Sequence, residues 1–141
     1  MTASADVASG NVRRLQPLRV ALSGGDRRFV RVTSFLLARR GYEVSQVSPG
    51  DAVEAAERQC ADVVVLETNG SRADAARKVA ALQALAASPG VLVVVDDGSQ
   101  ELWTGLETIR KWVQIDELAE AIEAASARRP TRLADAEEHA L

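Results

Sequence analysis

Two stretches of the chain are apolar without interruption, and each of them ends on an acidic residue. In ADVVVLETN (61–69) the apolar run stops at Glu67, and in VLVVVDD (91–97) it stops at Asp96. Because neither run alternates with polar positions, we expect both faces of each strand to be covered, as in the middle of a parallel sheet. Open α/β sheets bind ligands at the carboxyl ends of their strands. Glu67 and Asp96 are therefore predicted to lie at that edge.

The remaining chain alternates between predicted strands and predicted helices with short connections. Further strands are expected over Leu18–Leu22, Tyr42–Val47 and Thr108–Val113. Helices are expected over about 27–40, 51–60, 71–87 and 115–125, with a weakly signalled helix at 100–106. Five strands that alternate with helices predict an α/β fold, a five-stranded parallel sheet that is doubly wound as (βα)5.

Periodicity and capping residues predict how the helices are placed. The first helix begins after Asp26, a favourable N-cap residue, and ends at Gly41. Its predicted apolar face consists of Phe29, Val32, Phe35, Leu36 and Leu37. The Ala-rich helix is expected to turn Val79, Leu82 and Ala86 inward. The last helix has the stripe typical of an amphipathic helix, formed by Ile115, Leu118, Ala119, Ile122 and Ala125.

Composition restricts the class of protein. The 141 residues suit one domain, expected over 18–126, between a flexible arm at 1–17 and a polar tail at 127–141. The net charge of -3 argues against nucleic acid as a partner. No apolar run approaches the roughly 20 residues that cross a bilayer, and residues 1–17 do not resemble a signal peptide. We therefore expect a cytoplasmic protein without a membrane partner.

Single residues exclude further kinds of chemistry. The only histidine, His139, lies in the polar tail, which argues against a histidine-based metal site or acid–base mechanism in the domain. The only cysteine, Cys60, allows no internal disulfide and is expected to be a small buried residue at the end of a helix. No residue pattern indicates a catalytic centre, so we expect a protein without enzymatic activity.

The predicted topology brings a set of polar and glycine residues to one rim of the sheet. These residues follow the first, third, fourth and fifth strands: Gly24, Gly25, Asp26, Glu67, Asp96 and Lys111. In element order and spacing over about 18–126, the chain resembles the receiver domain of two-component response regulators, a flavodoxin-like fold. The resembling stretches are RVALSGGDRRF, LLARRGYEV, ADVVVLETN, VLVVVDD and KWVQIDELAEAI.

The resemblance implies a site with most of its chemistry altered. Receivers accept a phosphoryl group on an aspartate, and Glu67 stands at that position. Gly24 and Gly25 replace the acidic pair that holds Mg²⁺, with Asp26 next to them, and Asp96 replaces the usual Thr or Ser. Lys111 matches the receiver lysine, although Trp112 follows it in place of proline. The resemblance thus implies a degenerate, phosphorylation-independent pseudo-receiver without a metal cofactor.

Two alternatives for the domain and two interpretations of Glu67 remain open at this point. The domain could still accept a phosphoryl group, on Asp96 or Glu67, with Mg²⁺ as cofactor. It could instead be a small Rossmann-like ligand-binding domain, although the glycine turn at 24–25 lacks the G-x-G-x-x-G fingerprint. Glu67 itself has two interpretations, as an imitation of the phosphorylated aspartate paired with Lys111 or as a strand end that is merely satisfied by Lys111 or water.

The expected mode of action is protein–protein interaction, because no output domain is predicted beside the receiver-like domain. Partners implied by the resemblance are a kinase, another regulator or a second copy of the chain as a homodimer. Trp103 and Trp112 are interface candidates, since large aromatic side chains are favoured at interface centres. The first helix is basic, which suits either a partner or a solvated surface.

Overall fold

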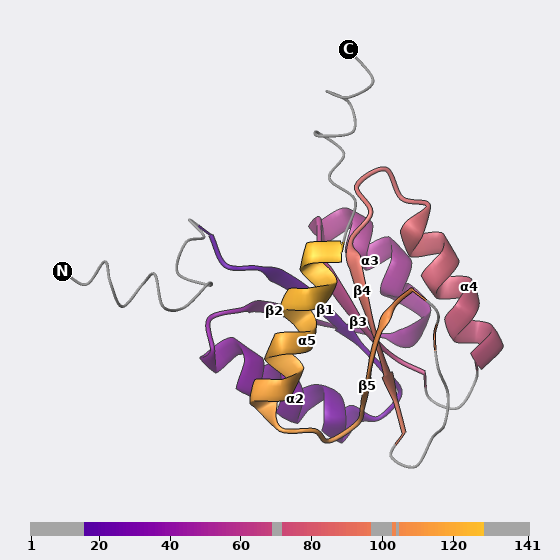
Figure 1. The fold of residues 1–141 in the computed structure, drawn as a ribbon. Coiled ribbons are helices and arrows are strands. Elements are labelled where there is room, and N and C mark those ends of the chain that lie inside the picture. The colour runs from indigo at the N-terminus through magenta and orange to yellow at the C-terminus, as the bar shows by residue number, and fades with distance from the viewer. Residues whose placement is uncertain (1–15, 69–71, 97–102, 104, 129–141) are drawn as a thin grey trace.

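The computed structural model describes residues 16–68, 72–96, 103 and 105–128 (Figure 1). All five strands form one parallel sheet in the order β2-β1-β3-β4-β5. The strands are β1 (Arg19–Ser23), β2 (Glu43–Val47), β3 (Val63–Glu67), β4 (Gly90–Val95) and β5 (Glu107–Arg110). The helical elements are α2 (Arg27–Arg39), the 3-10 turn η2 (Pro49–Asp51), α3 (Ala52–Gln59), α4 (Arg72–Gln83) and α5 (Ile115–Arg128). The predicted doubly wound parallel sheet is confirmed.

Helices cover both faces of the sheet, and each face has its own core. Residues of α2 and α5 pack against one face together with Leu22, Val63 and Val65. Residues of α3 and α4 pack against the other face together with Val64 and Leu66. The two uninterrupted runs, β3 and β4, are buried along their whole lengths. This explains why they show no alternation, because both sides of a central strand face apolar helices.

The apolar face predicted for α2 is partly wrong. Phe29 and Leu37 are buried as expected, and they share their side of the helix with Val30, Thr33 and Ser34. The other three predicted core residues are exposed at the surface: Val32, Phe35 and Leu36. Only one side of a helix of 3.6 residues per turn can face the sheet, and here the stripe through positions 29, 33 and 37 does so.

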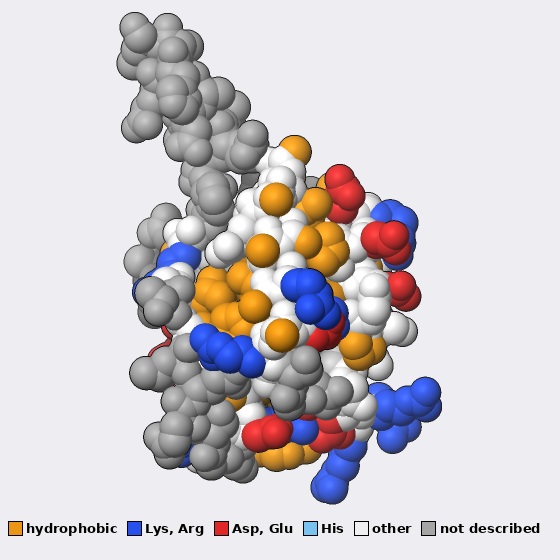
Figure 2. Space-filling model, turned by 90° about the vertical axis from the view of Figure 1, so that its right-hand side faces the viewer, with side chains coloured by type: hydrophobic (Ala, Val, Ile, Leu, Met, Phe, Trp, Pro, Cys, Tyr) orange, Lys and Arg blue, Asp and Glu red, His pale blue; other side chains and the backbone are white. Residues whose placement is uncertain are grey.

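The predicted helix over 71–87 is shorter in the structure. Within the described residues, α4 ends at Gln83, and Leu85 donates its backbone N–H to Leu82 O at 3.2 Å in a tighter i→i+3 turn. Ala86, predicted to face inward, is exposed as a consequence. Val79 and Leu82 are buried as expected. Figure 2 shows the side of the molecule that carries α4, where hydrophobic side chains are interspersed with charged ones.

Two other expectations need correction. Cys60 is exposed, because it ends α3 in the left-handed conformation with φ 55° and its side chain leaves the core. The last strand ends at Arg110, not at Val113, since the chain turns at Lys111 and Trp112. The helix predicted at 100–106 falls mostly outside the described residues. No helix in the described part of the chain is long and apolar enough to cross a membrane.

Candidate functional site

The residues predicted at the rim do lie at the carboxyl ends of their strands. Glu67 is the last residue of β3, while Asp96 and Lys111 directly follow β4 and β5. Gly24, Gly25 and Asp26 form the turn between β1 and α2. Three of the six side chains, those of Asp26, Glu67 and Lys111, are in direct contact.

Glu67 is a buried carboxylate with partners on both oxygens. Its side chain is only 1% exposed, and Oε2 lies 2.6 Å from Lys111 Nζ. Oε1 accepts a hydrogen bond of 3.1 Å from the backbone N–H of Asp26. Burying a carboxylate is costly unless it is paired and hydrogen-bonded. Glu67 is therefore stable at this position only because β5 and the β1–α2 turn supply a cation and a donor.

Asp26 connects the start of α2 to the same lysine. Its Oδ1 accepts hydrogen bonds from the backbone N–H groups of Arg28 and Phe29, each at 3.1 Å, which confirms the predicted N-cap. Its Oδ2 lies 2.7 Å from Lys111 Nζ. The hydrogen bond from Lys111, followed by that from the Phe29 backbone, holds the pKa of Asp26 below its ordinary value of 3.8. One short side chain thus caps a helix and neutralises part of the lysine charge.

Lys111 is the centre of the cluster. Its side chain is 13% exposed, and its ammonium group lies 5.7 Å from the centre of the Phe29 ring. Desolvation by itself would lower the pKa of Lys111, but the hydrogen bonds to Asp26 and Glu67 outweigh it and raise the pKa above 10.5. Lys111 therefore stays protonated across the physiological range.

Asp96 belongs only to the outer part of the cluster. Its Oδ1 is 3.9 Å from Lys111 Nζ, and its side chain is 64% exposed. At this distance and exposure, the pair is worth little. Asp96 lies at the position that the resemblance assigns to Thr or Ser, so a carboxylate faces solvent where a receiver would place a hydroxyl group.

Gly24 provides the space that the Glu67 side chain occupies. A Cβ atom at position 24 would lie 2.9 Å from Glu67 Cβ, 3.2 Å from Glu67 Cδ and closer still to Oε1. Any residue with a side chain would therefore push against Glu67. Gly24 and the glutamate at the end of β3 are sterically matched to each other.

The site does not fit the Mg²⁺ ion that the receiver fold implies. Magnesium requires several hard oxygen ligands in nearly octahedral geometry. Gly24 and Gly25 contribute no carboxylate, and the oxygens of Asp26 and Glu67 face a lysine ammonium group instead. No group of three or more His, Cys, Asp or Glu side chains in the described residues is arranged to hold a metal ion.

The two tryptophans have different environments. Trp103 is only 9% exposed and packs in the core beside α3 and α4, with the Arg72 guanidinium 4.4 Å from its ring centre. Trp112 is 48% exposed and packs edge-to-face on Phe29, with 5.4 Å between the ring centres. Its φ of 66° is unusual for a bulky residue. Only Trp112 thus retains the exposure that an interface residue needs.

Sequence reasoning did not identify two parts of this arrangement. Asp26 is predicted among the rim residues, but the sequence does not show that it shares Lys111 with Glu67 at nearly the same distance. Phe29 was assigned to the core, and its ring also lies near the ammonium group. The N-cap pattern predicted where Asp26 sits in the chain, but it contains no information on where the second carboxylate oxygen points.

Comparison with known proteins supports the fold alone. No protein-family profile and no curated protein sequence matches the chain. Solved receiver domains do match in structure. FixJ-N has a TM-score of 0.72 at 18% identity, covering 83% of this chain and 99% of that one. The receiver domain of a LuxO repressor protein from Vibrio parahaemolyticus has a TM-score of 0.68 at 19% identity, and the match covers 88% of this chain and 98% of that one.

A third structure, the receiver domain of the response regulator NarL from Mycobacterium tuberculosis, has a TM-score of 0.65 at 19% identity, covering 79% of this chain and 98% of that one. The chain therefore has the fold of a response regulator receiver domain and spans nearly the whole length of these domains.

The steric match between Gly24 and Glu67 can be tested by mutation. We expect Gly24→Ala to lower the free energy of unfolding by about 1–3 kcal/mol, because the added methyl group overpacks the site. In a Glu67→Ala background the same change should cost less, since the carboxylate is gone. Urea unfolding of the four proteins measures this coupling. The control is Gly50→Ala, where a Cβ meets no atom within 4 Å; equal losses at both glycines would contradict the match.

The ion cluster predicts a defined pH dependence. Lys111→Met should lower the free energy of unfolding by about 1–3 kcal/mol near pH 7, because it leaves buried carboxylate oxygens without a cation. The lowered pKa of Asp26 means that its contribution is present above about pH 4 and is lost as the pH falls through its folded value. The raised pKa of Lys111 means that its contribution is present below about pH 10.5 and is lost as the pH rises through its folded value.

The difference between wild type and Lys111→Met should therefore be level between these limits and shrink on either side. Denaturant unfolding over this pH range measures it. A difference that changes steadily between pH 5 and 9 would show that other groups control the cluster.

Proposed function

We propose that this protein is a receiver-like signalling module that acts by binding another protein and does not depend on phosphorylation. One observation carries the proposal: Lys111 Nζ is held between Glu67 and Asp26, at 2.6 and 2.7 Å, where a phosphoryl group and a metal ion would otherwise have to enter.

Such a cluster is poorly suited to phosphoryl transfer. The reaction requires a nucleophile in line with the donor and cations that neutralise the oxygens of the transferred group. Lys111 is already paired with two carboxylates of the protein, and Gly24 and Gly25 offer no side-chain ligand for a second cation. An incoming phosphoryl oxygen would also meet the exposed carboxylate of Asp96. The charges of the site thus disfavour the reaction at each position where a receiver favours it.

Glu67 can act in this proposal as a built-in substitute for a phosphorylated aspartate. It places a carboxylate oxygen on Lys111 without any modification, because glutamate is one methylene longer than aspartate. The alternative is that the pair only stabilises the end of β3. The two differ in one respect: a substitute must affect partner binding when the Glu67–Lys111 contact is removed.

An exposed apolar surface supports interaction with a protein. We call it the α2 patch: Val32, Phe35, Leu36 and Trp112, which are 40%, 60%, 37% and 48% exposed. A hollow of about 60 Å³ between α2 and the chain after β5 is lined by members of this patch, together with Ile109 and Val113. Clustered large apolar side chains at a surface are typical of interaction sites.

Basic residues border the α2 patch. The Arg28 guanidinium lies 5.8 Å from the centre of the Trp112 ring, and that of Arg39 lies 5.7 Å from the centre of the Phe35 ring. A partner that covers the patch would therefore combine apolar anchors with acidic residues. Two copies of the same basic surface would repel each other, which favours a different protein over a homodimer on this face.

Incubation with Mg²⁺ and a small phosphodonor such as acetyl phosphate tests the proposal. We expect the intact mass of the wild type to remain unchanged, because no set of side chains in the described part of the chain is arranged to hold the metal. The matched variant Gly25→Asp/Glu67→Asp shortens the carboxylate at the end of β3 and places an acidic residue beside Asp26 without adding a side chain at position 24, and it should gain the mass of one phosphate. A phosphate on the wild type, mapped to Glu67 or Asp96, would overturn the proposal in favour of an atypical phosphoryl acceptor.

The partner surface is tested by affinity capture from a lysate of the native host. Phe35→Glu should reduce recovery of the specific partner at least tenfold, because it places a charge at the most exposed apolar side chain of the patch. The control Ala80→Glu puts the same charge on the exposed side of α4 and should leave recovery unchanged. Equal recovery with Phe35→Glu would exclude the α2 patch as the binding surface.

The same assay with Glu67→Ala and Lys111→Ala separates the two interpretations of Glu67. Loss of the partner in both variants, with retained folding by circular dichroism, supports the substitute; unchanged recovery supports a purely structural pair. Light scattering of the wild type and Phe35→Glu reports any homodimer formed through the patch.

A further inference from the structure

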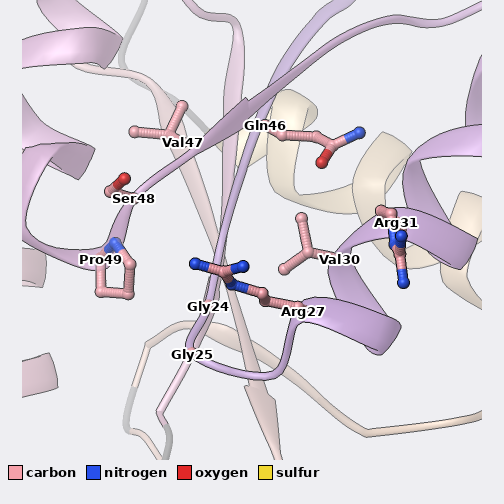
Figure 3. Close-up of a pocket in the computed structure, with 9 residues that line it drawn as sticks. All are labelled: Gly24, Gly25, Arg27, Val30, Arg31, Gln46, Val47, Ser48 and Pro49. Carbon is pink, nitrogen blue, oxygen red and sulfur yellow. The ribbon is translucent and has the colours of Figure 1, made fainter.

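A groove of about 520 Å³ lies beside the β1–α2 turn, on the edge of the sheet that carries β2 (Figure 3). One wall is the first part of α2, with Arg27, Val30 and Arg31. The other wall is the end of β2 and the residues after it, from Gln46 to Pro49, and Gly24 and Gly25 close the groove at the turn.

The charged residues of the groove are both cations. Arg27 and Arg31 line it, and no Asp or Glu does. In the described part of the chain neither arginine takes part in an ion pair, whereas Arg19, Arg40, Arg77 and Arg128 do. Figure 3 shows the Arg27 side chain extending from α2 toward β2, with Val30 between the two arginines. Two guanidinium groups are thus available to a ligand within one turn of helix.

The nearby acidic residues face away from this groove. Asp26 directs Oδ2 to Lys111 and Oδ1 to the start of α2, and Glu67 is buried against Lys111. Neither side chain lines the groove. The pairing with Lys111 therefore directs both carboxylates away from the groove and offsets part of their negative charge.

Hydrogen-bonding and apolar groups complete the lining. Gln46 and Ser48 offer side-chain donors, and Val30, Val47 and Pro49 offer apolar surface. The volume lies within the range of about 300–1,000 Å³ that is typical of small-molecule sites. Guanidinium groups match the oxygens of phosphate groups, which they can bind with two hydrogen bonds each.

We propose that this groove binds a phosphorylated small molecule with at least two anionic groups, such as a nucleoside diphosphate, held by Arg27 and Arg31. The phosphates lie on the guanidinium groups, with Gln46 and Ser48 as further donors, and the organic part packs on Val30, Val47 and Pro49. This proposal does not rest on the role of Glu67 or on the partner that covers the α2 patch.

Isothermal titration calorimetry at a fixed ionic strength tests the groove, with pyrophosphate, ADP and adenosine as probes. Pyrophosphate and ADP should bind saturably with one site per chain, and adenosine should not. Arg27→Gln and Arg31→Gln should each weaken binding about tenfold or more, because each removes a charge-assisted contact worth more than about 1.4 kcal/mol. Tighter binding of ADP than of pyrophosphate would assign the apolar wall to the nucleoside.

Arg39→Gln is the matched control. It removes the same charge from the same helix, but Arg39 does not line the groove, and binding should stay within twofold of wild type. Equal weakening by Arg39→Gln would reduce the effect to general attraction by a basic helix and overturn the proposal. Failure of pyrophosphate and ADP to bind at millimolar concentration would also overturn the proposal. Equally tight binding of a short acidic peptide would overturn it as well, because the groove would then be a protein-docking surface.

Discussion

The contact between Lys111 and Glu67 determines the arrangement of the whole rim. A carboxylate at the end of a buried central strand is tolerated only with a cation beside it, and the turn after β5 supplies that cation. The same ammonium group holds Asp26, which caps α2, and the space for Glu67 exists because residue 24 has no side chain. One ion pair thus connects β1, β3, β5 and the start of α2, and a change at any of these positions affects the others.

The sheet and its edge could be predicted from the sequence, because buried strands leave an unmistakable signal. The runs that end at Glu67 and Asp96 have no polar interruption, and both are central strands. The nearness of Lys111 to Glu67 also followed from topology alone. The sequence did not show which side of α2 faces the sheet, because Val32, Phe35 and Leu36 are as apolar as the residues that do face it. Hydrophobicity shows that a side chain can be buried, but only the position of the neighbouring elements decides whether it is.

The fold of this chain and the side chains of its site differ in how much they indicate about function. Receiver domains of similar structure are only 15–20% identical to this chain, so packing requirements alone preserve the architecture. The arrangement at the strand ends depends on a few side chains, which likeness of fold does not determine. Likeness of fold therefore says little about phosphorylation, which depends on the geometry of side chains such as Glu67, Asp26 and Lys111.

The pairing of Gly24 with Glu67 also restricts how such a site can change over time. An acidic residue introduced at position 24 alone would collide with the Glu67 side chain, and a shortening of Glu67 to aspartate alone would leave the site without metal ligands. The turn after β1 and the end of β3 are therefore coupled, because a larger residue at position 24 fits only if the side chain at position 67 changes with it.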